Sequence, residues 1–190
     1  MNKAVFLDKD GTINEDVGYL DDPAKLTVFP YSAQAIKILN DAGFKVIIVS
    51  NQAGIARGIL TEDIYQAIDK KTHKIILQDG GIIDASYYCP HHPEHGIHPY
   101  RTKCENRKPN PGMLKKGEKE FDLDLSKCYM IGDKISDIQA GHNAGVKTIL
   151  VKTGYGKDHV NNPKLKELNP VFIGENLLEA AEWIVKNEKI

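Results

Sequence analysis

Short apolar runs alternate along this chain with segments whose apolar residues recur at helical spacing, and this order limits the folds that it can adopt. The apolar runs cover residues 4–7, 44–49, 82–88, 128–131, 148–151 and 171–173. Helical spacing is seen in residues 30–43, 61–78, 138–145 and 177–185. Strands that alternate with helices predict an α/β fold with a mostly parallel sheet and helices on both faces.

Small polar or acidic residues follow several of the predicted strands. Asp8 and Asp10 come after the first, Ser50 ends the second and Asp133 follows the fourth. In open α/β sheets, ligands collect at the carboxyl ends of the strands. The sequence therefore predicts one reaction centre at that edge of the sheet.

Asp8 and Asp10 carry the chemistry that we expect there. Two carboxylates held close together repel, and an apolar strand end favours the neutral form of at least one. A bound Mg²⁺, which prefers oxygen ligands, reduces that cost. Asp8 can then act as a nucleophile and Asp10 as a general acid and base. The alternative is an ordinary polar turn, because Asp-Gly turns are common.

The stretch Asp8-Lys-Asp-Gly-Thr12 resembles the first motif of the haloacid dehalogenase (HAD) superfamily, whose members mostly transfer phosphoryl groups through an aspartate and Mg²⁺. Ser50 matches its second motif and Lys108 its third, so the resemblance implies that both hold the phosphoryl group. We expect Mg²⁺ to bind Asp8, Asp133 and the backbone carbonyl of Asp10. The implied fold is the Rossmann-like HAD fold without a large cap domain, because only short insertions separate the elements.

Residues 89–110 interrupt the alternation as a loop insertion. Two of the three cysteines and four of the seven histidines lie within residues 89–104. Cys89, His91 and Cys104 would supply three of the four ligands of a tetrahedral structural zinc site. The alternative is an exposed polar loop whose histidines are incidental.

The same loop resembles that of the heptose-bisphosphate phosphatases and the related histidinol-phosphatase domains, through Cys89-Pro-His-His-Pro and Arg107-Lys108-Pro109. Those proteins bind zinc through Cys-X-His and Cys-X-Cys pairs, and here Asn106 replaces the last cysteine. Either the loop is metal-free, or a nearby histidine completes the zinc site. The candidates are His92, His95 and His98.

The resemblance to this branch implies hydrolysis of D-glycero-D-manno-heptose 1,7-bisphosphate at its 7-phosphate, on the way to the heptose of lipopolysaccharide, S-layer or other glycans. A second phosphate would give Arg107 and Lys134 a role. The remaining expected substrate-binding residues are Asp16, Val17, Gly18, Tyr19, Ser50, Asn51, Gln52 and Lys108. Histidinol phosphate is the alternative substrate. A catalytically silent sugar-phosphate sensor is disfavoured by the intact pair of aspartates.

Length and charge limit the number of domains and the classes of partner that we expect. The 190 residues suit a single domain, 1–190, with a sizeable core. The 25 basic residues balance the 26 acidic ones, so no basic field for nucleic acid is expected. No apolar run approaches the roughly 20 residues that span a bilayer, and charged residues interrupt the N-terminal apolar run. We expect a cytoplasmic monomer, without a membrane partner, whose cysteines are thiols or metal ligands.

Three local predictions concern single segments. Asn110 is placed to cap a helix that begins at Pro111. His73 is expected at the surface, and residues 161–170 are expected to lie mostly at the surface. Asp137 is expected near the magnesium site, where it would orient ligands or waters.

Overall fold

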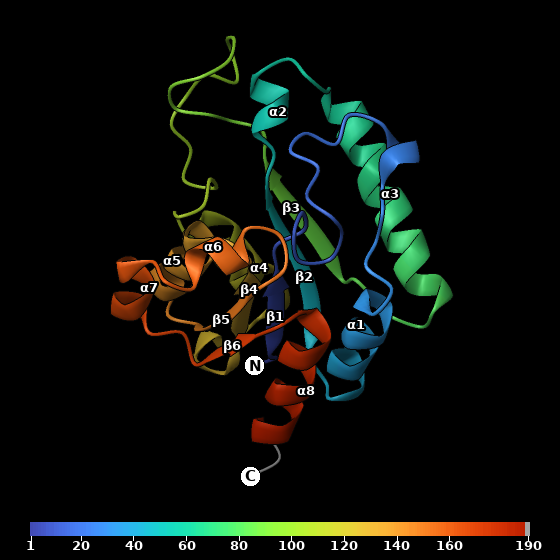
Figure 1. Cartoon of the computed structure of the whole chain (residues 1–190), viewed down its shortest axis with the longest axis vertical. Helices are drawn as coiled ribbons and strands as arrows, with labels where there is room; N and C mark the ends of the chain where they lie inside the picture. Colours follow the sequence, from blue (N-terminus) through green and yellow to red (C-terminus); the bar gives the residue numbers. More distant parts are fainter. Residues whose placement is uncertain (189–190) are drawn as a thin grey trace.

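The computed structural model describes residues 1–188, and these form a six-stranded sheet in which every neighbouring pair of strands is parallel. The strand order is β3-β2-β1-β4-β5-β6 (Figure 1). The strands are β1 (Ala4–Leu7), β2 (Lys45–Asn51), β3 (Ala85–Cys89), β4 (Tyr129–Gly132), β5 (Lys147–Val151) and β6 (Phe172–Gly174). The predicted α/β class and parallel sheet are confirmed.

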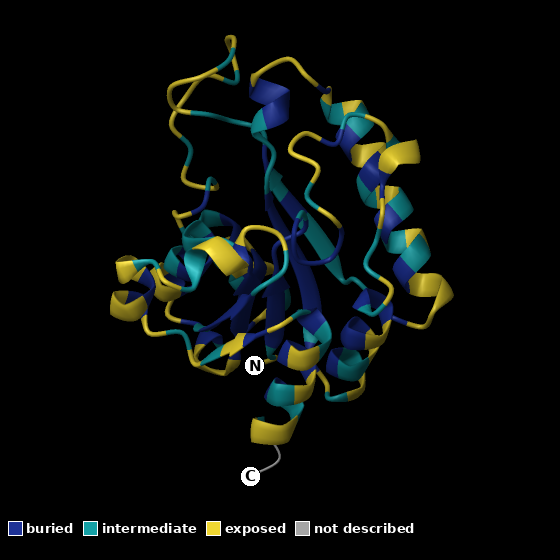
Figure 2. Cartoon of the chain, in the orientation of Figure 1, coloured by how far each residue is buried: buried dark blue, intermediate teal, exposed yellow. Residues whose placement is uncertain are grey.

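Helices cover both faces of the sheet, as predicted. One face is covered by α1 (Ser32–Asp41), α3 (Glu62–Gln78) and α8 (Leu177–Glu188), and the other by α4 (Gly112–Phe121) and α5 (Ile135–Ala144) (Figure 1). Side chains alternate between the faces along a strand. Val5 and Leu7 therefore pack into the first core, and Phe6 into the second. Figure 2 shows the buried sheet between helices whose outer sides are exposed.

Five short helical elements complete the described chain. They are η1 (Pro23–Lys25), α2 (Ala53–Ala56), η2 (Leu125–Lys127), α6 (Gly156–His159) and α7 (Pro163–Leu168).

The strand order brings the predicted site residues to one edge of the sheet. The chain builds outward from β1 through β2 and β3 on one side, and through β4 to β6 on the other. The chain therefore leaves the adjacent strands β1 and β4 in opposite directions, and their carboxyl ends form a topological switch point, where ligands of open α/β sheets bind. Asp8 follows β1 and Asp133 follows β4 at that point, while Ser50 lies in the neighbouring β2.

The predicted start of α3 is confirmed, whereas that of α4 is wrong. The Thr61 hydroxyl accepts a hydrogen bond from the Ile64 N–H and so caps α3. Asn110 makes no such cap, because its side-chain amide donates to the carbonyl oxygen of Cys104. The α4 helix begins one residue later than predicted, at Gly112, with Pro111 before its first turn.

Two other local predictions concern exposure. Residues 161–170 are mostly exposed, as predicted, but they contain the helix α7, whose Leu165 and Leu168 are buried in a small core against α5 and β5. Two leucines three residues apart bury one side of this short helix. His73 is only partly exposed, because its Nε2 atom lies 2.8 Å from the hydroxyl oxygen of Ser86 in β3.

Residues 89–110 leave the sheet after β3 and arch past α2 before the chain enters α4 (Figure 1). The Ile97 N–H donates to the carbonyl oxygen of Ala56 in α2. The Tyr100 hydroxyl donates to Glu62 in the first turn of α3, over 2.6 Å. The insertion is thus fastened to the elements that follow β2. Within residues 1–188, none of the helices has the length and apolar character needed to cross a membrane.

Candidate active site

Three buried carboxylates gather at the carboxyl end of the sheet. Carboxylate oxygens of Asp8, Asp133 and Asp137 all lie within 4.8 Å of one another. Asp8 follows β1, Asp133 follows β4, and Asp137 lies in the first turn of α5. Asp137 also accepts a hydrogen bond from the Lys134 N–H, over 3.0 Å. The negative charge of this cluster requires cations nearby.

Lys108 provides one of these cations. Its Nζ atom lies 2.7 Å from Asp8 Oδ1 and 2.7 Å from Asp137 Oδ1, and it donates to the carbonyl oxygen of Val49 over 2.7 Å. Burial opposes its charge, but Asp137 and Asp8 outweigh that effect and raise the pKa of Lys108. Lys108 is therefore a charged, immobile donor beside the Asp8 carboxylate.

Asp133 is the carboxylate whose charge is least compensated. Its Oδ2 atom accepts from the Tyr155 N–H over 2.8 Å, whereas its buried Oδ1 atom has no hydrogen-bond partner. Burial, followed by the nearby Asp8 and Asp137, raises the pKa of Asp133 to about 8. An unpartnered oxygen beside two other carboxylates fits a divalent metal ion with oxygen ligands, such as Mg²⁺.

Two glycines allow the backbone to approach Asp133. Gly11 has a φ of +92°, and a Cβ atom there would lie 2.3 Å from Asp133 Oδ2. Gly154 has a φ of +53°, and its Cβ would lie 2.2 Å from the same oxygen. Both positions therefore require glycine.

Asp10 is held by three polar side chains. Its Oδ1 atom lies 3.2 Å from Lys9 Nζ and accepts from the Asn14 amide over 2.9 Å, while Oδ2 accepts from the Gln52 amide over 2.9 Å. Burial opposes ionisation, but Lys9 and the hydrogen bonds from Asn14 and Gln52 outweigh it and lower the pKa of Asp10. The carboxylate is thus ionised, and ready to accept a proton, in the free protein.

Lys9 and Asn14 are site residues that the sequence analysis missed. The Lys9 side chain is only 1% exposed, and its Nζ atom donates to Asn14 Oδ1 over 2.9 Å. A buried lysine needs a paired charge, and Asp10 is the carboxylate beside it. The sequence did contain a clue to Lys9, because this lysine lies between the two aspartates at the end of a buried strand.

The end of β2 contributes a second group of polar side chains. The Ser50 hydroxyl is buried and accepts from the Gln52 amide over 2.8 Å. Gln52 therefore joins Ser50 to Asp10. Asn51 instead binds the backbone of Lys108 through two hydrogen bonds, of 2.9 and 3.0 Å, and so fixes the segment that carries this lysine.

One cavity collects most of the predicted residues. It encloses about 490 Å³, including the part that is open to solvent. The lining residues are Asp8, Asp10, Asp16, Gly18, Tyr19, Ser50, Asn51, Gln52, Ala53, Gly54, Lys108, Lys134, Ser136 and Asp137. Of these, Ala53, Gly54 and Ser136 were not predicted.

Lys134 and Asp16 lie on the same side of this cavity. The Lys134 Nζ atom is 2.8 Å from Asp16 Oδ2, 4.0 Å from Asp133 Oδ1 and 4.8 Å from the centre of the Tyr155 ring. Burial opposes its charge, but Asp8 and Asp133 outweigh it and raise the pKa of Lys134. A second fixed cation therefore faces the cavity.

The structure separates two predicted substrate-binding residues from the cavity. Val17 is 54% exposed and does not line it, because Gly18 has a positive φ of +83° and reverses the loop there. Arg107 lines a different hollow, next to Cys104, and its guanidinium donates to the carbonyl oxygen of His91 over 3.0 Å. Arg107 thus braces the insertion in this structure.

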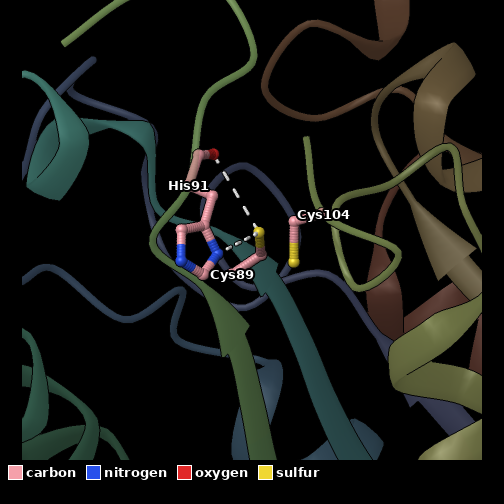
Figure 3. Close-up of side chains that lie close together, drawn as sticks. All are labelled: Cys89, His91 and Cys104. Carbon is pink, nitrogen blue, oxygen red and sulfur yellow. Dashed lines mark hydrogen bonds between the residues drawn. The ribbon is translucent and has the colours of Figure 1, made fainter. Parts of the chain in front are cut away.

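The insertion brings Cys89, His91 and Cys104 together, as predicted. Figure 3 shows the Cys89 sulfur facing both the His91 ring and the Cys104 sulfur. One ligand atom from each of the three lies within 4.8 Å of the others, and Cys89 Sγ is 3.9 Å from His91 Nδ1. Burial is the main cause that raises the pKa of the Cys89 thiol to about 12. Two sulfurs and one imidazole match the ligand chemistry of zinc.

In the part of the chain that the structure describes, none of the predicted fourth ligands, His92, His95 and His98, joins this group of three. Nor does Asn106, which stands where the resemblance implies a cysteine. Asn106 is exposed and lines a separate hollow with residues of β3 and α4. His92 Nδ1 already accepts hydrogen bonds from the N–H groups of Glu94 and His95. Among the described residues, the group with metal-ligand spacing in this loop contains only the two cysteines and His91.

Comparisons with known proteins agree with this geometry. A family model described as "HAD-hyrolase-like" matches residues 105–180, which contain Lys108, Asp133 and Asp137. A crystal structure of D,D-heptose 1,7-bisphosphate phosphatase from B. bronchiseptica, complexed with magnesium and phosphate, superposes with a TM-score of 0.86. That protein is 34% identical, and the match covers 98% of this chain and 99% of the other.

Similar sequences carry closely related names. A D-glycero-D-manno-heptose-1,7-bisphosphate 7-phosphatase from Thermosynechococcus vestitus is 40% identical over 185 residues, which is 95% of this chain and 94% of that protein. The D-glycero-beta-D-manno-heptose-1,7-bisphosphate 7-phosphatase of Haemophilus ducreyi is 42% identical, with 80% and 84% of the two chains covered. This chain therefore belongs to the HAD-like hydrolases, in the family of the heptose-1,7-bisphosphate 7-phosphatases.

Proposed function

We propose that this protein is an Mg²⁺-dependent phosphatase that removes the 7-phosphate of D-glycero-D-manno-heptose 1,7-bisphosphate. The observation that carries this proposal is the contact of 2.7 Å between Lys108 Nζ and Asp8 Oδ1, in a cavity that Asp10 and Lys134 also line. The proposed nucleophile Asp8, the phosphate-binding cation Lys108 and the proton carrier Asp10 all line this cavity. A relative named as a heptose-1,7-bisphosphate 7-phosphatase matches 95% of the chain.

In the first step, a carboxylate oxygen of Asp8 attacks the phosphorus atom, and the bond between phosphorus and the sugar oxygen breaks. Lys108 and the Ser50 hydroxyl hold the equatorial oxygens of the phosphoryl group as their charge redistributes. Asp10 donates a proton to the departing sugar oxygen. Bound Mg²⁺, held by Asp8, Asp133 and the Asp10 carbonyl, would neutralise phosphate charge and keep the reacting oxygens aligned.

In the second step, the phosphate leaves Asp8. Asp10 takes a proton from a water molecule, which attacks the phosphorus atom of the aspartyl-phosphate and releases inorganic phosphate. Asp10 is ionised in the free protein, so it can accept this proton, and Asn14 and Gln52 hold its carboxylate in place. The dianionic phosphate of the substrate raises the pKa of the same carboxyl by charge repulsion, so that it can carry the proton of the first step.

Lys134 offers a reason for a substrate with two phosphates. Its ammonium lies at the cavity beside Asp16, at a position separate from Lys108. We propose that it contacts the phosphate that is not transferred, or the sugar next to it. Residues 1–188 include no large cap domain. The insertion and the loop with Gly18 and Tyr19 would therefore cover an extended substrate.

The test is phosphate release from a panel of substrates. With Mg²⁺ present, we expect kcat/KM for heptose 1,7-bisphosphate to exceed that for histidinol phosphate by at least about tenfold, the worth of one hydrogen-bonded contact. Both anomers are assayed, since relatives are named for each. Removal of Mg²⁺ by a chelator should abolish turnover. Faster hydrolysis of histidinol phosphate would contradict the substrate, and release of no phosphate would favour a silent sensor.

We also propose that Cys89, His91 and Cys104 hold a structural zinc ion, with water as the fourth ligand. Metal would ionise both thiols and fasten the start of the insertion to its end. Elemental analysis of purified protein should find about one zinc per chain, and Cys104→Ser should lose it. Asn106→Cys should slow zinc removal by a chelator if that side chain turns inward. Zinc well below one per chain would contradict the site.

A further inference from the structure

A column of polar side chains lies behind Ser50, on the side away from the substrate cavity. The α3 helix carries Tyr65, Asp69 and His73 at intervals of four residues, so that they share one face of the helix. His73 contacts Ser86 in β3, and the Tyr65 ring packs against Tyr88 in the same strand at 4.5 Å between ring centres. This face of α3 therefore looks onto the sheet.

Tyr65 is buried without the hydrogen bond that its hydroxyl needs. The residue is 2% exposed, and the hydroxyl has no partner in hydrogen-bonding geometry. Burial is the main cause that raises its pKa well above the usual value, and Asp69 adds to the shift, whereas the nearby Ser50 hydroxyl lowers it. Ser50 of β2 is the register partner of Tyr88, on which the Tyr65 ring packs, and Asp69 lies one turn after Tyr65 in α3. Tyr65 therefore lies between Asp69 and Ser50.

Asp69, one helical turn after Tyr65, also has a buried oxygen without a hydrogen-bond partner. Its Oδ1 atom is buried and unpartnered, while Oδ2 lies 3.5 Å from His73 Nε2. A buried polar atom without a partner loses its hydrogen bonds to water and gains none in return, which destabilises the folded state. Native proteins commonly remove such costs with an internal water that touches two to four polar groups. One donor and one acceptor without partners on the same helix face are suited to such a water.

We propose that an internal water joins Asp69 to Tyr65, and that Tyr65 thereby acts as a positioning residue for Ser50. The water donates one hydrogen to Asp69 Oδ1 and the other to the Tyr65 oxygen. A small shift of the Tyr65 ring, whose hydroxyl has no partner in this structure, lets that hydroxyl donate to the Ser50 oxygen. Ser50 already accepts from Gln52, so both of its acceptor sites are then filled. Its own proton is left to bind the phosphoryl oxygen, as the proposed phosphatase reaction requires.

Tyr65→Phe tests this role, because it removes only the hydroxyl. We expect kcat to fall about tenfold, the effect of one hydrogen bond in the transition state, with KM nearly unchanged. The melting temperature should fall only modestly, because the proposed water and Ser50 each lose one hydrogen bond. A purely structural role predicts lower stability with normal kcat, so the fall in kcat is the readout that separates the two roles. Tyr87→Phe is the matched control, because Tyr87 contacts Glu120 from the other face of the sheet.

A double-mutant cycle with Ser50→Ala separates the inference from the proposed function. If Tyr65 acts through Ser50, then Tyr65→Phe should have no further effect on kcat in the Ser50→Ala protein. Full additivity of the two losses would overturn the inference while leaving a phosphatase. A wild-type protein without phosphatase activity would instead overturn the function. A high-resolution crystal structure should contain the water between Tyr65 and Asp69, and an empty site there would also overturn the inference.

Discussion

Asp8→Asn is expected to lose turnover by on the order of 10⁴-fold or more, because an amide cannot form the covalent bond to phosphorus. Lys108 would keep Asp137 and the Val49 carbonyl as partners, so the phosphate-binding cation stays in place. Phosphate release from the heptose bisphosphate is measured with Mg²⁺. Asp8→Ala is assayed in parallel, because deamidation of an asparagine would restore the aspartate.

This loss of activity should not come with a loss of stability. The nearby Asp8 carboxylate helps to raise the pKa of Asp133, which means that the ionised cluster is under repulsion. Removing one charge relieves that repulsion but also removes the ion pair with Lys108, so the melting temperature of the metal-free protein should stay close to that of the wild type. Asp41→Asn, at an exposed surface ion pair, is the matched control with normal turnover. Near wild-type turnover by Asp8→Asn would exclude Asp8 as the nucleophile.

The sequence allowed us to predict, for a physical reason, which residues meet at the carboxyl ends of the strands. Apolar β-branched runs must be buried, and parallel connections bring their ends to one edge. Asp8, Ser50 and Asp133 were therefore placed together without knowledge of the fold. The same reasoning does not reach Tyr65 or His73, because their roles depend on which face of α3 meets the sheet.

Side-chain directions in the insertion were harder to predict than the grouping of its two cysteines with His91. Cys89 ends a strand, and the Cys-X-His spacing brings His91 back toward it. Arg107 and Lys108 are neighbours in sequence, but their side chains diverge: Lys108 enters the carboxylate cluster, whereas Arg107 binds the His91 carbonyl. No periodicity in an irregular loop distinguishes these two directions. Asn106 also lies in a segment without regular secondary structure, and its side chain lines a hollow separate from the two cysteine sulfurs.

Asp10→Asn is expected to lower kcat on the heptose bisphosphate by about 10²–10⁴-fold, the usual contribution of a general acid and base. Its second expected effect depends on the leaving group. The nitrophenolate of p-nitrophenyl phosphate departs without a proton, so the first step survives in this variant. The second step still lacks its base, and the aspartyl-phosphate should accumulate. We therefore expect a burst of about one nitrophenolate per chain, followed by slow turnover.

The sugar substrate should give no such burst, because its alkoxide needs the proton that Asp10 carries. The two substrates distinguish loss of the proton carrier from distortion of the site. A distorted site would slow the first step with both substrates, whereas loss of the proton carrier slows it only with the sugar. Gln52 and Lys9 hold Asp10, so a shifted Gln52 could also disturb Ser50. Gln52→Ala measures that indirect effect, and it should slow both substrates without a burst. Steady nitrophenolate release by Asp10→Asn at the wild-type rate would assign the proton transfers to another residue.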